Sequence, residues 1–158
     1  MSGSRPQGSD DQYASGSRDT GCVSRSNVDA ARGVLPAFNR SFAQGTPDLF
    51  ELLDPQVEWI PITAALEGTS YQGTEGVHQW MEEMKRDWKV FETRPEEFRE
   101  LGGDRVLALG TWRAQGRGSG VELAAQHAAW LIDCRDGKVV RLQTFTDVER
   151  GLEAAGLR

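Results

Sequence analysis

Apolar residues recur every three or four positions in the first half of this chain, which is the spacing of amphipathic helices. One such stripe over residues 28–42 predicts a long helix that contains Pro36. A second stripe over residues 77–88 predicts another long helix, with Thr74 as its capping residue. Between them, Thr46 and Pro47 introduce a short helix over residues 48–53, because proline is favoured at a first helical position. Three helices are therefore expected before residue 90.

A strand is expected over residues 57–62, and strands dominate the chain after the third helix. Alternating apolar and polar residues predict strands over residues 92–101, 106–113, 121–134 and 138–146. In the second of these runs, Val106, Ala108 and Trp112 fall on one face and Leu107 and Leu109 on the other. A capping box at residues 146–149 predicts a short helix at the end of the chain. The order of elements indicates an α+β domain.

The dipeptide Asp136-Gly137 separates two β-rich runs and predicts a two-residue hairpin turn. Regular pairing from this turn puts the following side chains on one face: Trp130, Ile132, Cys134, Val139, Arg141, Gln143 and Phe145. The other face then carries Ala129, Leu131, Asp133, Val140, Leu142 and Thr144. Two interpretations remain open. Either the second face is the core and Arg141 and Gln143 meet solvent, or the first face lines an internal cavity.

Composition limits the possible partners and compartment. Residues 1–25 are polar and glycine-rich, so we expect a disordered tail there and a single domain over residues 26–158. The chain shows no apolar signal region and no apolar run long enough to span a membrane. Cys22 and Cys134 are far apart, which favours a reducing, cytoplasmic compartment. We expect no membrane partner.

Charge and ligating residues exclude further classes of function. The net charge of −6 comes without a basic stripe, so nucleic acid is not an expected partner. Only two histidines are present, and neither a metal nor a cofactor is expected. Glycines at 116, 118 and 120 leave open a phosphate-cradling turn before a helix, although their spacing differs from the dinucleotide fingerprint.

Several short motifs together carry a resemblance to a known family. They are LDPQVEW at residues 53–59, YQGTEGV at 71–77, the glycine-rich turn at 116–121, DGKVV at 136–140, FTD at 145–147 and AAGL at 154–157. In this order and spacing, the chain from about residue 28 to 157 resembles a SnoaL-like protein of the nuclear transport factor 2-like (ketosteroid isomerase-like) superfamily. The resemblance implies a cone-shaped, curved antiparallel sheet that wraps three N-terminal helices, the cystatin-like α+β barrel, with a short C-terminal helix. It also implies a homodimer through the convex face of the sheet.

The resemblance favours the cavity interpretation of the hairpin. Family members hold their ligand on the concave face, so the predicted ligand-binding residues are Trp59, Tyr71, Trp112, Trp130, Arg141, Gln143 and Phe145. Trp80 and Trp88 lie on the stripe of the third helix and are assigned to core packing. The predicted function is a small-molecule-binding domain with an aromatic-lined cavity and a hydrophobic small molecule as partner, with catalysis unproven.

The alternative is an isomerase- or cyclase-type enzyme that acts on a polyketide- or terpenoid-like substrate by general acid/base chemistry. Ketosteroid isomerase-like members carry acids at positions that match Trp59 and the vicinity of Trp130, where this chain has none. The remaining weak catalytic candidates are His127, Asp133 and Asp147. An epoxide hydrolase centred on Arg141 would need two carboxylates on the same face, and the hairpin supplies none.

Overall fold

A computed structural model describes residues 25–62, 69–118 and 120–157 of the chain. Helix α1 (Arg25–Gln44) is followed by the short α2 (Asp48–Glu51), strands β1 (Leu53–Ile60) and β2 (Tyr71–Gln72), and helix α4 (Gly73–Asp87). Four long strands and a last helix complete the domain: β3 (Trp88–Leu101), β4 (Arg105–Gly116), β5 (Glu122–Arg135), β6 (Lys138–Phe145) and α5 (Val148–Ala154). The tail was predicted over residues 1–25. Residues 1–24 lie outside the described residues, and Arg25 is the first residue of α1.

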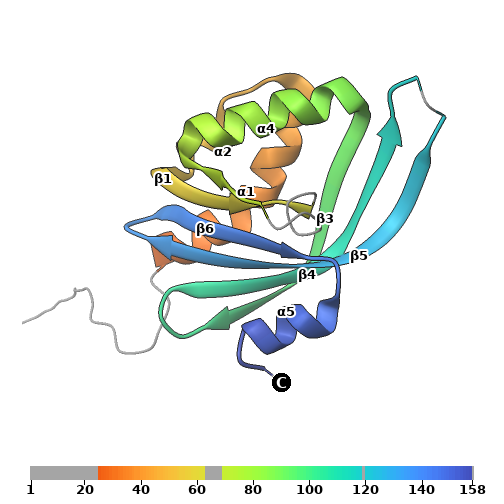
Figure 1. Cartoon of the computed structure of the whole chain (residues 1–158). Helices are drawn as coiled ribbons and strands as arrows, with labels where there is room; N and C mark the ends of the chain where they lie inside the picture. Colours follow the sequence, from red (N-terminus) through yellow and green to blue (C-terminus); the bar gives the residue numbers. More distant parts are fainter. Residues whose placement is uncertain (1–24, 63–68, 119, 158) are drawn as a thin grey trace, which may run out of the picture.

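The strands form one curved, unclosed sheet in the order β2-β1-β6-β5-β4-β3 (Figure 1). All neighbours are antiparallel except β1 and β6, which run parallel. Helices α1, α2 and α4 cover the concave face, and α5 packs against the convex face (Figure 1). The predicted α+β fold is confirmed. Because β5 is a strand, the alternative of a phosphate-cradling turn before a helix is wrong.

The core lies between the concave face and the helices. The apolar stripe of α1 supplies Val34, Leu35 and Phe38, and α4 supplies Val77 and Trp80, all almost fully buried. A smaller apolar cluster lies under α5 on the convex face, where Leu107, Ala129, Leu131 and Leu152 are buried. Both faces of the central strands are therefore covered, which agrees with the apolar residues that residues 106–113 carry on each face.

The helix caps differ from those predicted from sequence. Neither α2 nor α4 has a side-chain cap, and their N-caps are Pro47 and Gln72 rather than Thr46 and Thr74. The C-terminal helix is capped one residue later than expected, because the Asp147 side chain accepts a hydrogen bond from the Glu149 backbone N–H at 2.9 Å. Trp88 ends α4 and begins β3.

A β-bulge overturns the predicted register of the final hairpin. The turn itself is as predicted, since Asp136 and Gly137 both have positive φ (55° and 76°) and Arg135 pairs with Lys138. The register then shifts between Asp133 and Cys134, so that Asp133 pairs with Arg141. One extra residue in β6 reverses the face of every side chain beyond it. The prediction that Arg141, Gln143 and Phe145 share a face with Trp130 is therefore wrong, and Leu142 and Thr144 take those places.

The reversed side chains include one member of a row of alternating charges on the convex face. Glu58, Arg141, Asp133 and Arg105 lie directly opposite one another on β1, β6, β5 and β4. Arg141 Nε donates to Glu58 Oε1 and Arg105 Nε to Asp133 Oδ1, both at 2.9 Å. We call these four residues the charge ladder. Arg141 therefore has carboxylate neighbours on both adjacent strands.

Candidate functional site

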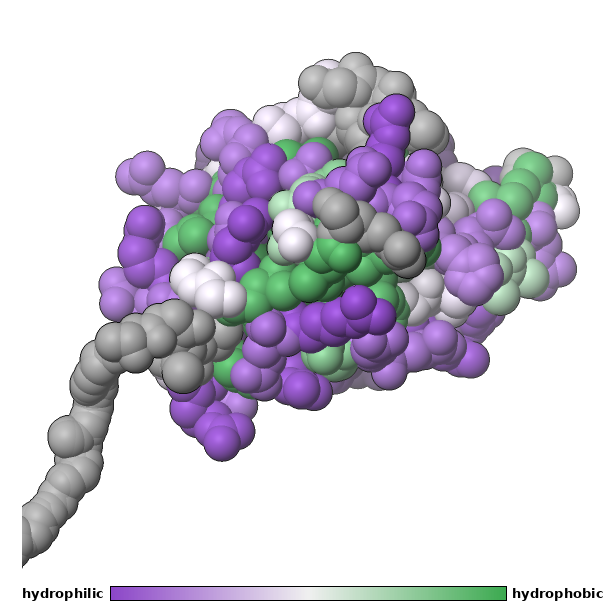
Figure 2. All heavy atoms as spheres, turned by 90° about the horizontal axis from the view of Figure 1, so that it is seen from below, coloured by the Kyte–Doolittle hydropathy of each residue, from purple (hydrophilic) through white to green (hydrophobic). Residues whose placement is uncertain are grey.

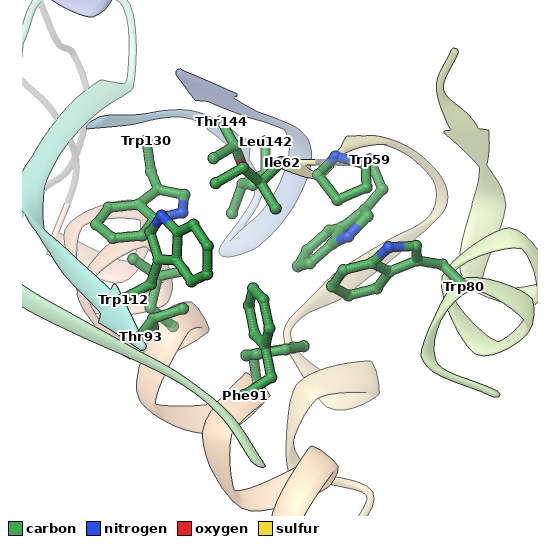
Figure 3. A pocket seen from close by; sticks show the side chains of 12 residues that line it. Trp59, Ile62, Trp80, Phe91, Thr93, Trp112, Trp130, Leu142 and Thr144 are labelled. Atoms are coloured by element: carbon green, nitrogen blue, oxygen red, sulfur yellow. The ribbon is translucent and has the colours of Figure 1, made fainter. Parts of the chain in front are cut away.

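An aromatic cavity lies between the concave face of the sheet and helices α1 and α4. Its volume is about 30 Å³. The lining side chains are Leu35, Phe38, Trp59, Pro61, Ile62, Trp80, Phe91, Thr93, Trp112, Trp130, Leu142 and Thr144. Figure 3 shows Trp59 and Trp80 on one side of the cavity and Trp112 and Trp130 on the other, with Phe91 between them. Four of the five tryptophans of the chain therefore meet at one place.

Different elements bring these four tryptophans together. Trp59, Trp112 and Trp130 lie on β1, β4 and β5, and Trp80 lies on α4. Strand alternation directs the three strand residues to the concave face, because their neighbours Glu58, Arg113 and Leu131 occupy the other face. Sheet curvature then brings side chains from separated strands toward a common centre.

The aromatic rings also pack against one another. Phe91 stacks on Trp112 with ring centroids 5.3 Å apart and an interplanar angle of 17°. Trp80 lies 5.8 Å from Trp59 and 5.5 Å from Phe38, in both cases tilted. Such contacts add about 0.5–1.5 kcal/mol each beyond the area that they bury. The cavity wall is therefore held in place by ring-to-ring contacts.

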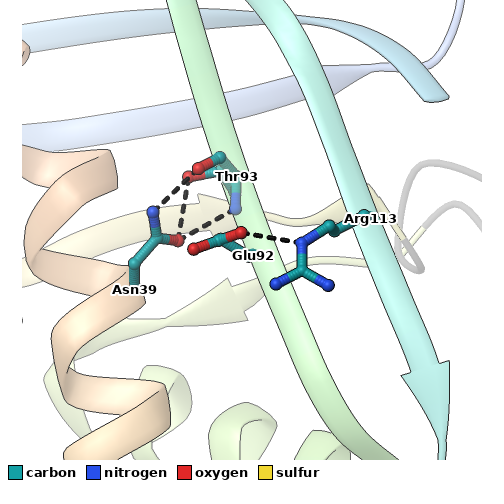
Figure 4. Close-up of polar contacts among 4 residues, drawn as sticks. All are labelled: Asn39, Glu92, Thr93 and Arg113. Carbon is teal, nitrogen blue, oxygen red and sulfur yellow. Dashed lines mark hydrogen bonds and ion pairs between the residues drawn. The ribbon is translucent and has the colours of Figure 1, made fainter. Parts of the chain in front are cut away.

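Asn39 fixes the strand that carries Phe91 and Thr93 (Figure 4). Its side-chain oxygen accepts hydrogen bonds from the Thr93 backbone N–H at 2.9 Å and hydroxyl at 3.0 Å, and its amide nitrogen donates to the Thr93 carbonyl at 2.8 Å. On the other side of β3, Arg113 Nε donates to Glu92 at 2.8 Å. The Thr93 hydroxyl is thereby positioned in the cavity wall by α1.

The polar groups of the cavity wall are few and uncharged. Within the described ranges, its lining includes no titratable side chain, and the threonines 93 and 144 are its hydroxyl groups. The indole N–H groups of Trp59 and Trp112 are buried and find no hydrogen-bond acceptor among the residues that the structure describes. Trp59 as a whole is only 2% exposed. Buried polar groups normally have a hydrogen-bond partner, so these two N–H donors are exceptions among the polar groups of the wall.

Three of the seven sequence-predicted ligand-binding residues line the cavity: Trp59, Trp112 and Trp130. Tyr71 lies on the edge strand β2 and its hydroxyl donates to Glu83 Oε1 at 2.9 Å. The structure places Arg141 in the charge ladder and Gln143 opposite Leu131 on the convex side. Phe145 packs in the apolar cluster under α5. The bulge thus removes the polar groups that the regular hairpin placed inside.

The three weak catalytic candidates all lie away from the cavity. Asp133 pairs with Arg105, and Asp147 caps α5. His127 is exposed on β5, where it borders a shallow convex-side depression together with Glu96 and Glu97. The structure therefore assembles none of them with the aromatic cavity or with one another.

Several lining residues were missed by sequence reasoning. Trp80, Phe38 and Phe91 look like ordinary core positions in a helical or alternating pattern, and they are buried in the core as well as lining the cavity. Leu142 and Thr144 were assigned to the wrong face. The spacing of Val139 and Leu142 is the signal for the bulge, because two core residues three positions apart cannot share a face in a regular strand.

The cysteine in β5 is not a reactive site. Burial raises the pKa of the Cys134 thiol to about 12, and the nearby carboxylates of Asp133 and Asp104 add to this effect. A thiol with so high a pKa is protonated at neutral pH and is a poor nucleophile.

In the part of the chain that the structure covers, no cluster of three or more metal-ligating side chains is found. No helix in the same part is long and apolar enough to cross a membrane.

Solved structures with the same fold include proteins that bind small molecules. An NTF2-like protein of unknown function from Burkholderia pseudomallei shares 21% identity and a TM-score of 0.65, covering 84% of this chain and 98% of its own. TerC, co-crystallised with polyporic acid, shares 23% identity and a TM-score of 0.64, over 83% of this chain and 98% of TerC. A protein with a ketosteroid isomerase-like fold from Catenulispora acidiphila, in complex with trimethylamine, shares 16% identity and a TM-score of 0.61. The match covers 79% of this chain and 93% of the Catenulispora protein.

The family comparison covers the core of the domain. No curated protein sequence matches the chain significantly. A profile of the SnoaL-like domain, however, matches residues 34–142, which is more than half of the chain and includes every strand that carries a cavity tryptophan. The chain belongs to the SnoaL-like domain family.

Proposed function

We propose that this chain is a small-molecule-binding domain whose aromatic cavity takes a hydrophobic ligand. The observation that carries the proposal is the convergence of Trp59, Trp80, Trp112 and Trp130 on one cavity that also contains unpaired polar groups. Ligand sites combine a largely apolar lining with a few polar groups that fix orientation. The small molecules in the solved structures of TerC and of the Catenulispora protein support this use of the fold.

The cavity is small, so binding requires its walls to move. Its volume of about 30 Å³ is near that of one water molecule, whereas an engineered cavity that takes benzene measures about 150 Å³. Opening the cavity breaks some of the ring-to-ring contacts of its wall, such as that between Phe91 and Trp112, and therefore has a cost. Apparent affinity is then reduced by the fraction of molecules that are open.

Binding alone fits the lining better than acid/base catalysis does. Proton transfer needs a positioned acid or base within hydrogen-bond reach of the substrate. Among the described residues that line the cavity, the polar side chains are Thr93, Thr144 and the indoles, and none of these titrates near neutral pH. The isomerase or cyclase alternative therefore gains no support from this lining.

A ligand screen read by thermal unfolding tests the proposal. Compounds with flat, apolar frames should raise the Tm of the wild-type protein, because a ligand that binds only the folded state stabilises it. Trp112→Leu should lose most of this shift. Arg141→Ala, which changes the opposite face, should retain it. Failure of every compound to raise the wild-type Tm, or an equal shift in Trp112→Leu, would contradict the proposal.

We also propose that the protein acts in the cytoplasm as a homodimer through its convex face. Apolar side chains around α5 remain partly exposed, among them Leu101, Leu109, Val148 and Leu157. Figure 2 shows the molecule from the side on which α5 lies, with a band of apolar surface between polar borders. Size-exclusion chromatography with light scattering should give twice the mass of one chain, and Leu109→Glu should give the monomer. A monomeric wild-type protein would contradict the dimer.

A further inference from the structure

One half of strand β5 forms an open edge of the sheet. Strand β6 pairs with β5 only from Ala129 onward, so residues 122–128 have β4 on one side and, among the described residues, no strand on the other. Figure 1 shows this part of the β4–β5 hairpin projecting beyond the end of β6. Backbone N–H and C=O groups along such an edge can pair with a further strand. We call residues 122–128 the open edge.

The open edge lacks the features that protect the other long edge of the sheet. On β3, Pro95 interrupts the row of backbone donors, and the Asn39 side chain bonds to the backbone N–H and C=O of Thr93. The open edge contains neither proline nor lysine, and three of its seven residues are alanines. It is preceded by Val121, which is 46% exposed and is the most exposed large apolar side chain of the described residues.

A β-bulge inside the open edge determines how this edge can pair with a second copy of itself. Residues 124–125 stand together opposite one residue of β4. Because of this extra residue, Glu122 and His127 lie on the same, convex face, although they are five positions apart in the sequence. For the same reason, Leu123 and Gln126 both lie on the concave face, opposite two β4 residues of that face.

A two-fold axis through the bulge matches the open edge with itself. Reversal about the midpoint of residues 124–125 places Glu122 opposite His127 of the second copy, and Leu123 opposite its Gln126. Each couple shares one face, as antiparallel pairing requires. The His127 imidazole N–H then donates to the Glu122 carboxylate, and the symmetry forms this contact twice. The lengths also match, because residue 121 at the hairpin turn of one copy comes opposite residue 128 of the other, directly before β6 begins to pair.

We propose that two copies of this chain pair through their open edges, antiparallel and in this register, so that one sheet continues across both molecules. The Gln126 side chain donates to the Ala124 carbonyl at 2.6 Å, so one acceptor of the bulge is already satisfied within the chain. The contact therefore relies on the residues on either side of the bulge. It lies outside the proposed ligand site, and its surface differs from that of the convex-face dimer.

The area of this contact makes the association weak. Seven residues a side cover much less than the roughly 800 Å² per partner of a standard interface. The pairing is therefore concentration-dependent, and it adds to the convex-face dimer rather than replacing it. Two different two-fold contacts on one chain produce assemblies larger than a dimer.

Disulfide formation between mixed variants tests the register. Glu122→Cys and His127→Cys are made separately in a Cys22→Ser background, in which the buried Cys134 is the remaining native cysteine. Under mild oxidation, the mixture should form a linked dimer at least about 10-fold faster than either variant alone, because residues opposite each other on paired strands have Cβ atoms about 4.5–5.5 Å apart. Lys89→Cys, which is exposed on β3, is the control and should link to Glu122→Cys only at the slow rate.

Charge exchange tests the same couple without a covalent bond. The Kd of association is measured by sedimentation velocity in a Leu109→Glu background, so that the proposed convex-face contact does not contribute. Glu122→Lys alone and His127→Glu alone should each raise the Kd by about 3- to 10-fold, because both symmetric couples are lost at once. The two substitutions together should restore the Kd to within about twofold, since opposite charges face each other again. Both side chains are exposed, so the Tm should stay unchanged.

Three results would overturn the inference. Equal linking rates in all mixtures would mean random collision. Failure of the double charge exchange to restore the Kd would mean that Glu122 and His127 do not face each other. If the Leu109→Glu protein stays monomeric at about 1 mM and the amides of the open edge exchange rapidly at every concentration, a second copy does not occupy the edge, and a segment of another protein remains as the occupant. Failure of the ligand site or of the convex-face dimer would leave the expected results unchanged.

Discussion

Replacement of Arg141 by alanine separates the bulged hairpin from the regular one. A regular hairpin places Arg141 in the cavity, where its loss would weaken ligand binding. The observed register places it in the charge ladder, between Glu58 and Asp133. We therefore expect Arg141→Ala to lower the stability of the protein and to leave ligand affinity unchanged.

The size of the effect follows from the exposure of the pair. Arg141 Nε lies 2.9 Å from Glu58 Oε1, and the two side chains are 33% and 39% exposed. Partly exposed ion pairs of this kind contribute about 0.2–1 kcal/mol. The truncation also leaves two carboxylates without the cation between them and removes a partly buried aliphatic stem. We expect a total loss of about 1 kcal/mol in the free energy of unfolding, or about 3 °C in Tm.

Chemical denaturation at low and high salt is the assay. The loss should shrink in 1 M NaCl, and a double-mutant cycle with Glu58→Gln should give a coupling of about 0.5 kcal/mol. Arg113→Ala is the matched control, because its pair with Glu92 is similarly short but more exposed, at 52% and 41%. Unchanged stability combined with weakened ligand binding would refute the bulged register and return Arg141 to the cavity.

Three further predictions concern the close packing at Gly110, the hydrogen bonds of Asn39 and the thiol of Cys134. Gly110→Ala should lower the free energy of unfolding by more than about 3 kcal/mol, because its Cβ would lie 2.1 Å from the backbone carbonyl oxygen of Arg94 on β3. Gly33→Ala on α1 is the control and should be neutral or slightly stabilising, because its Cβ would lie 3.6 Å from the nearest atom, in the side chain of Leu52. Asn39→Ala should cost about 2–3 kcal/mol by the same measurement, since three hydrogen bonds to Thr93 are lost. Because the pKa of Cys134 rises from 9.0 to about 12 on folding, its contribution to stability is complete below pH 9 and is lost as the pH rises toward 12. Denaturation at pH 8 and pH 10 should show the stability advantage of the wild type over Cys134→Ala fall by about 1 kcal/mol. An equal difference at the two pH values would contradict this.

Local sequence patterns predicted the architecture, whereas the β-bulge in β6, which they did not predict, changed which side chains face the cavity. The helix stripes, the alternation in residues 106–113 and the Asp136-Gly137 turn depend on near neighbours in the sequence, and the structure confirms all of them. The bulge opposite Cys134 depends on the fit of β6 between β1 and β5. That fit is tertiary, and it reverses the orientation of Arg141.

The tryptophans show the same division. Strand alternation put Trp59, Trp112 and Trp130 each on a defined face of its strand, but only the family resemblance indicated that these faces line the cavity. Trp80 was assigned to the core because a helix stripe alone does not reveal that the surface facing it contains a cavity. The unpaired N–H groups have no signature in sequence at all, because they depend on which acceptors the folded chain fails to bring near.

The proposed ligand site is the cavity lined by Trp59, Trp80, Trp112 and Trp130. The most direct measurement is the ¹⁵N–¹H spectrum of the five indole groups during titration with an apolar ligand selected by the thermal screen, with the signals assigned by single Trp→Phe variants. We expect the signals of the four cavity tryptophans to shift together with one Kd and the signal of Trp88 to remain unchanged. Shifts confined to Trp88 and to the backbone of α5 and its underlying strands would place the ligand outside the cavity and contradict the proposed site.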